Sequence, residues 1–479
     1  MSQRTLIRGA RVIEGDPATS SGEVADVLVE DGRIAAIGPD LESDAEVLDA
    51  SGGIVAPGFV DTHRHTWQTA MRGICADWTL LDYFRGIRIA ASAVYTPEDI
   101  YAGNAAGALE ALDAGVTCVL DFSHCLISPD HADEAVRGLR DAGLRGVFAY
   151  GMFPVGVPDP PFATPESRFD DARRVRTQHF SGEADLLRMG VALTELGLVP
   201  WEVTVGEVGV ARELDLMITT HTGSVHAEKR PPEVELLDAA GLLDARQVHV
   251  HCNACTEREL DLLAGAGASV SVTPETELQM GMGYPVTSKL IERGMTPSLG
   301  ADVISNNRGD LFGQMRLGLG CERARVNQQA LDRLEMPDSL SLTAGQMLQF
   351  ATLGGAKALG LDSEIGSLEA GKAADLVLLR GAGAAMNFAP SAEPVAQAVL
   401  HCGPGDVEAV MVAGEWVKRD GELLGDAPGR AYRAVSDSRE RIASAVGGWD
   451  ALLPEPPEGW FEGVIGAMEQ NLAGAGEAG

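Results

Sequence analysis

Short apolar runs separated by glycine turns fill the beginning of the chain, up to about residue 57. They read TLIRGARVIEG, ADVLVEDGRIAAIG and AEVLDASGGIV. Alternating apolar positions broken by turns are typical of an antiparallel sheet. The same kind of pattern returns after about residue 362, in ADLVLLRG, AVLHCG and VEAVMVAGEWVKRDGEL. We therefore predict one small composite β-sandwich domain, formed by residues 1–57 and 363–430 at the two chain ends.

Between these two regions the pattern changes to apolar strands that alternate with longer segments of helical period. The strand candidates are IVAPGFVD, VTCVLDF, RGVFAYG, GVALTEL, LMITTH, QVHVH, SVSVT and TPSLGAD. Such alternation predicts a parallel sheet with crossover helices, and eight strands are the number that closes a barrel. The fold class expected for residues 58–362 is an α/β, TIM-like (β/α)8 barrel.

Helix starts between the strands carry capping residues. Thr96 precedes Pro97, Thr256 is followed by Glu259, and Thr343 opens a further helical segment. These are the residue types that satisfy free backbone N–H groups in a first helical turn. Residues 431–479, which contain PEPPEGW and end in AGAGEAG, are expected to form a C-terminal helical extension and tail.

Charge and composition exclude several classes of function. The 479 residues are 45% apolar and 22% charged, as in an ordinary globular protein. A net charge of −33 would repel phosphate backbones and anionic lipids, so we expect no nucleic-acid or membrane partner. No apolar run of about 20 residues and no signal core are present, which favours a cytoplasmic location. The seven cysteines suggest reduced thiols; Cys252 and Cys255 form a CxxC pair for which packing is the default role.

Candidate metal ligands stand at strand ends. His63 and His65 are two residues apart at the end of an apolar strand, so their imidazoles can face one point. His221, His251 and Asp302 close three later strand candidates, and the carboxyl ends of barrel strands are where such folds place their chemistry. The chain has only ten histidines, and four of them occupy these positions. This concentration points to a site.

These segments together resemble a known family. IVAPGFVDTHRH, the two strand-end histidines, SLGAD and ATLGGAKALGLDSEIGSLEAGKAADLVLL are similar to the amidohydrolase superfamily, in its branch of deaminases and chlorohydrolases that act on purines, pyrimidines and triazines. The resemblance covers nearly the whole chain. It implies a barrel with a composite β-sandwich, a small-molecule substrate and a homo-oligomer, a dimer by family resemblance.

The resemblance also implies one divalent cation, Zn²⁺ or Fe²⁺, bound by His63, His65, His221 and Asp302. His251 falls where the family keeps a histidine that contacts the attacking water or the substrate without binding metal. No lysine ends the fourth strand candidate, GVALTEL, so a binuclear site bridged by a carboxylated lysine is not expected.

Elementary chemistry supports the same assignment. Neutral imidazoles and a carboxylate suit Zn²⁺ or Fe²⁺, and a bound cation lowers the pKa of water towards about 7. Asp302 can take the water proton and pass it to the leaving group, while His251 can stabilise developing negative charge. We expect hydrolysis of a C–N bond, by deamination or amide hydrolysis, in a cyclic or heterocyclic substrate. The alternatives are displacement of a halide or ester oxygen, and a non-catalytic assembly protein, against which the intact ligand set argues.

The sequence departs from the deaminase pattern at the position of the general acid. Deaminases of this branch carry a glutamate three residues after the fifth-strand histidine, whereas this chain reads His221-Thr222-Gly223-Ser224. A serine hydroxyl is a poor proton donor because its pKa lies far above neutral. Glu275 and Glu277, in VTPETELQMG, are the candidates to replace the acid, although both are open to a reading as ordinary loop carboxylates.

Several further residues are candidates for substrate contact. Ser224 and the residues Trp67, Gln68 and Arg72, which follow the HxH pair, are expected near the substrate. Trp67 could equally form an apolar wall, and Gln68 and Arg72 could serve packing or solubility. His124, in DFSHC, could reach the mouth of the barrel or be structural.

Overall fold

The computed structural model describes residues 4–182, 185–381, 388, 393–453, 455–473 and 475. Eight parallel strands form a barrel sheet, and a bridge between Arg64 and Asp302 joins its first strand to the segment after its last. This confirms the predicted barrel. Its strands are β6 (Phe59–Arg64), β7 (Val116–Ser123), β8 (Arg145–Gly151), β9 (Leu187–Ala192), β10 (Met217–Thr222), β11 (Gln247–His251), β12 (Ser269–Val272) and β13 (Ser298–Leu299).

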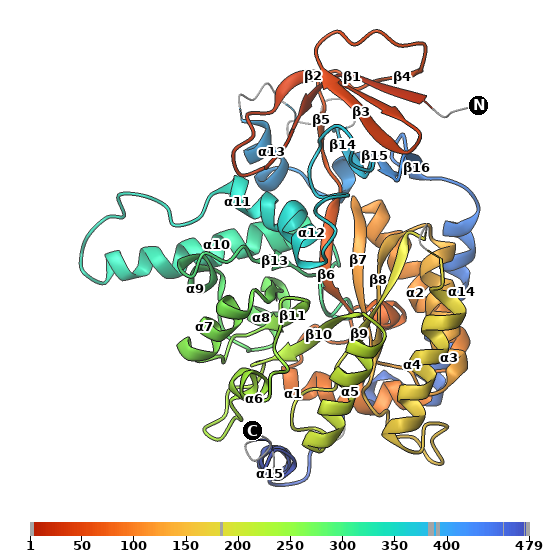
Figure 1. Ribbon diagram of the computed structural model, residues 1–479, viewed down its shortest axis with the longest axis vertical. Coiled ribbons are helices and arrows are strands. Elements are labelled where there is room, and N and C mark those ends of the chain that lie inside the picture. Colours follow the sequence, from red (N-terminus) through yellow and green to blue (C-terminus); the bar gives the residue numbers. More distant parts are fainter. Residues whose placement is uncertain are drawn as a thin grey trace.

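A second, separate sheet of nine strands is built from both chain ends, as predicted (Figure 1). Its central strands run antiparallel, except that β4 and β5 lie parallel to β1. The strands are β1 (Arg4–Val12), β2 (Glu23–Glu30), β3 (Arg33–Gly38), β4 (Glu46–Asp49), β5 (Ile54–Pro57), β14 (Leu376–Leu379), β15 (Val407–Val412), β16 (Glu415–Arg419) and β17 (Glu422–Leu423).

Two predicted strands have different bounds in the structure. The candidate IVAPGFVD is divided, because β5 pairs with β1 and β14 in the nine-stranded sheet and only β6 enters the barrel. The candidate GVALTEL was placed too far along the chain. β9 begins at Leu187 and ends at Ala192, so Glu195 lies in the loop beyond the strand.

The helices cover the barrel and include all three predicted caps. Thr96, Thr256 and Thr343 each accept from the backbone N–H three residues on, in capping boxes. The helices are α1 (Leu80–Tyr83), α2 (Pro97–Asp113), α3 (Pro129–Asp141), α4 (Pro165–His179), α5 (Trp201–Glu213), α6 (Glu233–Ala239), α7 (Glu257–Ala266), α8 (Pro274–Gln279), α9 (Thr287–Glu292), α10 (Leu311–Leu331), α11 (Ala344–Gln349), α12 (Gly355–Ala358), α13 (Pro394–Leu400), α14 (Ala427–Ala445) and α15 (Trp460–Asn471). Shorter 3₁₀ and π turns include η1 (Thr66–Met71) and η2 (Phe84–Ala91).

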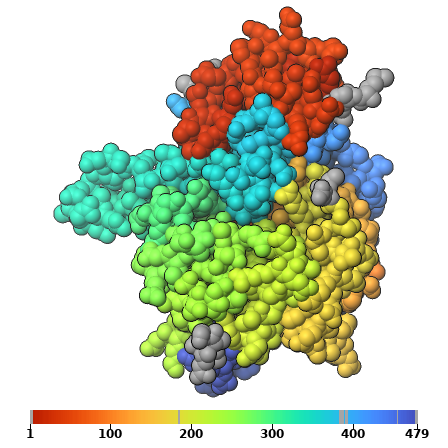
Figure 2. Space-filling model, viewed as in Figure 1, coloured from red at the N-terminus to blue at the C-terminus, as the bar shows by residue number. Residues whose placement is uncertain are grey.

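The C-terminal part of the chain contains the helices α14 and α15, and the final helix lies far from the nine-stranded sheet. α15 sits at the opposite end of the molecule from that sheet (Figure 1). Figure 2 shows the sheet as one lobe above the barrel, with α10 and the loop after it projecting to one side. The end of the predicted tail, residues 476–479, lies outside the described residues. Among the residues that the structure describes, no helix could cross a membrane.

A buried ion pair fixes the nine-stranded sheet to the amino-terminal end of the barrel. Arg145, the first residue of β8, donates from Nε and Nη2 to the Asp375 carboxylate at 2.8 and 3.0 Å. Asp375 immediately precedes β14, and its Oδ1 also accepts from the Ala413 N–H at 2.8 Å. Because parallel barrel strands all start at this end, their carboxyl ends remain open at the other. The strand-end histidines therefore lie on the face opposite the sheet.

Barrel closure leaves no room beside His63, and this generates a first prediction. A Cβ atom on Gly300 would lie 2.8 Å from the His63 Cβ and carbonyl oxygen. Gly300→Ala should therefore lower the free energy of unfolding, by about 1–3 kcal/mol for an overpacked site, and displace a candidate metal ligand. Urea denaturation and elemental analysis measure the two effects.

Gly265→Ala is the matched control, because Gly265 lies within α7 and a Cβ there meets nothing within 4 Å. That variant should be unchanged or more stable by up to about 1 kcal/mol. Equal stability and equal metal content in the two variants would show that the Gly300 contact does not constrain His63.

Candidate active site

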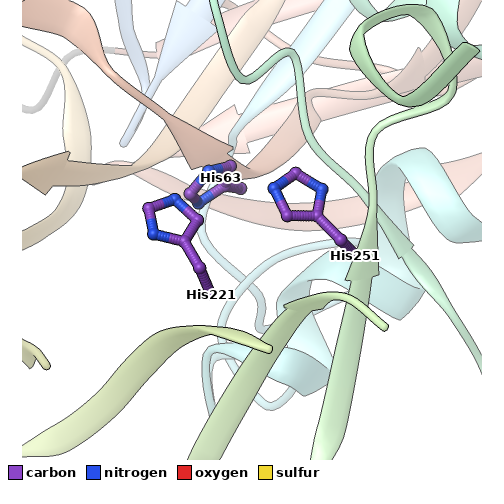
Figure 3. Close-up of side chains that lie close together, drawn as sticks. All are labelled: His63, His221 and His251. Atoms are coloured by element: carbon purple, nitrogen blue, oxygen red, sulfur yellow. The ribbon is translucent and has the colours of Figure 1, made fainter. Parts of the chain in front are cut away.

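Four side chains converge at the carboxyl end of the barrel. Asp302 Oδ1 lies 3.1 Å from His63 Nε2 and 3.3 Å from His65 Nε2. His221 Nε2 lies 3.3 Å from His65 Nε2. Figure 3 shows the rings of His63, His221 and His251 turned towards a common space at the ends of three strands. The structure thus brings the four predicted ligands together in one buried cluster.

Hydrogen bonds on the far sides of two rings determine what the cluster can bind. His65 Nδ1 faces the Phe122 carbonyl oxygen at 3.1 Å, and His221 Nδ1 faces Glu195 Oε1 at 2.9 Å. Both partners are acceptors, so both Nδ1 atoms carry the proton and both Nε2 atoms present lone pairs. Two lone pairs 3.3 Å apart repel each other unless a cation lies between them. The cluster therefore fits a divalent metal ion.

The protonation of the other two ligands agrees with this interpretation. Burial lowers the pKa of His63 well below its usual value, so its ring is neutral and able to coordinate. Asp302 Oδ1 faces the Nε2 atoms of both His63 and His65, so this residue supplies a carboxylate oxygen to the cluster. Neutral nitrogen ligands with one carboxylate form the donor set of catalytic zinc and iron sites.

His251 stands beside the cluster and is held by Glu277. Its Nδ1 lies 3.3 Å from Glu277 Oε1, and its Nε2 lies 3.9 Å from Asp302 Oδ2. Burial lowers the pKa of His251, but the bond to Glu277 and the charge of Asp302 outweigh it and raise that pKa overall. Glu277 is itself fully buried and accepts from the Thr273 N–H at 2.8 Å. The carboxylate therefore orients His251 from behind.

Two of these residues have strained backbones. His251 has a φ of 76° and Asp302 a φ of 60°, in the left-handed region that residues with a Cβ rarely adopt. Such conformations persist only where surrounding contacts impose them, and they concentrate at functional sites. Here the sharp turn after each strand directs the side chain towards the barrel axis.

Glu195 is a site residue that the sequence interpretation missed. It lies in the loop after β9, where its Oε1 contacts His221 and accepts from Arg88 Nη1 at 2.7 Å. Burial would raise the pKa of Glu195, but Arg88 and His221 outweigh it and lower that pKa. A carboxylate held charged in this way fixes the His221 tautomer. The sequence interpretation had placed Glu195 inside the strand candidate GVALTEL, so its position in a loop at the mouth of the barrel could not be seen.

A cavity of about 380 Å³ opens above the cluster. Its polar floor is formed by His65, His221, His251 and Asp302, with Glu195, Glu233, Arg88 and Arg230 at the sides. Most of the wall is apolar. It includes Leu80, Leu81, Phe84, Ile89, Phe153, Leu196, Leu198, Val225, Met282, Trp460, Phe461, Val464, Ile465 and Met468.

Of the predicted substrate contacts, Ser224 lines this cavity and Trp67, Gln68 and Arg72 do not. Trp67 is completely buried and donates from Nε1 to His124 Nδ1 at 3.0 Å. His124 in turn stacks on His65, with 4.1 Å between ring centroids. These two residues therefore support the His65 ring from outside the cavity.

Gln68 and Arg72, the other two residues expected near the substrate, point into the protein packing or outward and do not line the cavity. Gln68 is buried and bonded to the Tyr83 hydroxyl at 2.7 Å and to Ser305 at 3.1 Å. Arg72 turns outward to Glu110. The 3₁₀ turn η1 directs these side chains into the packing around the barrel, and the HxH pattern carried no information about that direction.

Glu275, the other predicted acid, points away from the cavity. Its carboxylate accepts from Gln314 Nε2 at 3.0 Å, so it is bound to α10. Cys252 and Cys255 are buried free thiols, and neither belongs to a candidate metal cluster among the described residues.

Comparisons with known proteins place these features in context. A model of the amidohydrolase family matches residues 54–417, which ends before α14 and α15. The 5′-deoxyadenosine deaminase of Methanothermobacter thermautotrophicus is 30% identical over 407 residues, covering 83% of this chain and 90% of that protein. The 5-methylthioadenosine/S-adenosylhomocysteine deaminase of Symbiobacterium thermophilum is 30% identical over 437 residues, covering 87% and 94%.

Solved structures show the same fold. An adenosine deaminase from Xanthomonas campestris with bound zinc has a TM-score of 0.76 and 25% identity, over 92% of this chain and 98% of that one. An atrazine chlorohydrolase from Arthrobacter aurescens in complex with zinc has a TM-score of 0.73 and 22% identity, over 91% and 100%. The second likeness extends to the fold alone.

Metal content is the second prediction. Purified protein should hold about one divalent ion per chain, because the two facing lone pairs and Asp302 enclose one cation position. His63→Ala and Asp302→Ala should each lose most of it, whereas His401→Ala, at an exposed position after α13, should keep it. Elemental analysis of protein prepared without chelators decides this. Two ions per chain, or equal content in all variants, would contradict the proposed cluster.

Proposed function

The chain belongs to the amidohydrolase family, and on that premise we propose that it uses one divalent ion to hydrolyse the bond between a nitrogen heterocycle and its amino group. The observation that carries the proposal is the convergence of three imidazole Nε2 atoms and Asp302 in one cluster, of which His65, His221 and Asp302 line the cavity. The deaminase relatives support the choice of an amino leaving group.

His63, His65, His221 and Asp302 would hold the ion, and zinc is the metal we favour for this donor set. A bound divalent cation makes water nucleophilic near neutral pH. Asp302 Oδ2 would accept the proton that this water loses, since Oδ1 faces the two histidines. The 3.9 Å between Asp302 Oδ2 and His251 Nε2 exceeds a direct hydrogen bond but suits a water that contacts both.

The contacts with Glu277 and Asp302 raise the pKa of His251 against the effect of burial, which favours a doubly protonated ring. In that form Nδ1–H donates to Glu277, and Nε2–H would face Asp302 Oδ2 and the space where negative charge develops during attack. Glu277 therefore acts in this proposal as a positioning residue, in place of the acid role that the sequence suggested. The charged Glu195 keeps His221 oriented and does not donate a proton.

The substrate we propose is an amino-substituted purine nucleoside that carries an apolar substituent. The polar floor suits a heterocycle, and the wall above it is apolar. α15 contributes five residues to that wall and is tied to the barrel by Asn471 Nδ2, which donates to the Gly197 carbonyl oxygen at 2.8 Å. Burial of apolar area against this helix would add binding energy distant from the reacting carbon.

Ammonia release from a defined panel tests the proposed reaction. The panel contains 5′-deoxyadenosine, 5′-methylthioadenosine, adenosine and a chlorotriazine, and ammonia and halide are measured separately. We expect ammonia from the nucleosides, fastest at low concentration for those with apolar 5′ groups. Halide release from the triazine without any ammonia from the nucleosides would contradict the proposal and favour displacement of a group that needs no protonation.

The α15 wall yields a separate prediction. Trp460→Ala should raise KM for the substrate with the apolar substituent by about tenfold, from partial loss of about 1.5–3 kcal/mol of apolar burial, with kcat little changed. Adenosine should be affected less. Tyr432→Ala, on α14 and 73% exposed, is the matched aromatic control. An equal change in KM for both substrates would show that α15 does not contact the substituent.

The homodimer, the cytoplasmic location and the domain limits at residues 57, 362 and 430 stay predictions. Sedimentation of the purified protein tests whether it is a homodimer.

A further inference from the structure

The proposed reaction needs a proton at a ring nitrogen, and the position after β10 does not provide an acid. Ser224 lines the cavity there, and its hydroxyl oxygen is buried without a hydrogen-bond partner. When water adds to the ring carbon, the electron pair of the C=N bond moves to the nitrogen. A donor with a pKa near the working pH makes that step efficient.

Glu233 lies close to Ser224, the position at which related deaminases carry the acid. It is the first residue of α6, nine residues beyond Ser224, and the intervening loop folds back to bring its carboxylate to the cavity wall. Glu233 Oε2 accepts from the Gly223 N–H at 2.8 Å, and the residue is 7% exposed. The carboxylate is therefore adjacent to the backbone that in related deaminases would present the acid.

The charges around Glu233 leave it able to hold a proton. Arg230 Nη1 lies 3.5 Å from Glu233 Oε1, but the other arm of this guanidinium contacts the fully buried Glu259 more closely. The single positive charge of Arg230 is therefore shared between two buried carboxylates, and Glu233 is stabilised by only part of it. Burial raises the pKa of Glu233 to about 7, Arg230 and the Gly223 N–H oppose the rise, and Glu259 adds to it. A carboxyl group of this pKa is matched to proton transfer near neutral pH.

The other carboxylates that line the cavity are bound to neighbouring side chains. Among the described residues, the carboxylates lining it are Glu195, Glu233 and Asp302. Asp302 belongs to the metal cluster, and Glu195 is paired with Arg88 and His221. Glu275 and Glu277, which the sequence suggested, bind Gln314 and His251. Glu233 is the acid left to face the substrate.

We propose that Glu233 is the general acid of this enzyme, placed on α6 in compensation for Ser224. The inference rests on the proposed deamination. As the C–O bond forms, one water proton passes to Asp302 and Glu233 protonates the ring nitrogen. As the C–N bond breaks, the amino group takes the Asp302 proton and leaves as ammonia. The remaining hydroxyl proton, released when the carbonyl forms, restores Glu233, so that substrate and water are converted to ring amide and ammonia.

Glu233→Gln tests the assignment while keeping an acceptor for the Gly223 N–H. We expect kcat to fall about 10²- to 10⁴-fold with KM and metal content little changed. Glu235→Gln is the control and should keep its rate, because Glu235 lies two residues further along α6 and is partly exposed beside Arg258. A Glu233→Gln enzyme with full kcat would overturn the proposal.

A second variant separates an acid from a merely structural carboxylate. Adding Ser224→Glu to Glu233→Gln returns an acid to the position after β10 and should recover a substantial part of the lost rate. A structural role for Glu233 would not be rescued from Ser224. Failure of rescue, in a folded protein with normal metal content, would count against the acid assignment.

Infrared spectroscopy provides a readout that does not depend on turnover. Burial also raises the pKa of Glu207 to about 8 and that of Asp61 to about 6, so both contribute to difference spectra of the metal-loaded protein across about pH 7. The band of Glu233 is therefore the carboxylic acid component that is lost in Glu233→Gln and kept in Glu235→Gln. If wild type releases no ammonia but shows the band, the proposed function fails while Glu233 still holds a proton. If ammonia is released and the band is the same in both variants, Glu233 is not the acid.

Discussion

Backbone hydrogen bonds between the first barrel strand and the segment after the last one hold the site together. The Asp302 N–H donates to the His63 carbonyl oxygen at 2.8 Å, and the His65 N–H donates to the Asp302 carbonyl oxygen at 3.2 Å. These bonds join residues far apart in sequence and place the Asp302 carboxylate against His63, in β6, and His65, the residue that follows this strand. Asp61 reinforces them, because its Oδ1 accepts from the Ala301 N–H at 3.0 Å. These backbone bonds fix the relative positions of His63, His65 and Asp302, around which the other site residues lie.

The carboxylates near the cluster differ in their contacts and in their protonation, and so in the role that each can have. Glu195 is kept charged by Arg88 and His221, and Glu277 is held behind His251. Glu233 shares its arginine with a second carboxylate, and burial raises its pKa to about 7. The net charge of −33 says nothing about these differences, because each depends on burial and on the cations within contact.

Residues at strand ends could be predicted from the sequence, and residues that reach the site from loops and helices could not. The two-residue spacing of His63 and His65 and the strand-end positions of His221 and Asp302 follow from the geometry of a parallel barrel. Glu233 is different, because it approaches from α6 through a loop whose path depends on tertiary contacts. The wall formed by α15 is a similar case. The pattern of this helix indicates an apolar face but not what that face contacts. Trp67, Gln68 and Arg72, which follow the HxH pair, do not line the cavity, because the turn η1 directs this segment into the packing around the barrel.

The direct test of the central claim is the coordination of the bound metal, measured by X-ray absorption at the edge of the ion that copurifies. If His63, His65, His221 and Asp302 surround one cation, the spectrum should show nitrogen and oxygen neighbours at about 2.0–2.2 Å, with the multiple scattering of imidazole rings. A sulfur neighbour at about 2.3 Å, or a second metal at about 3.5–4 Å, would contradict the single site described for this barrel.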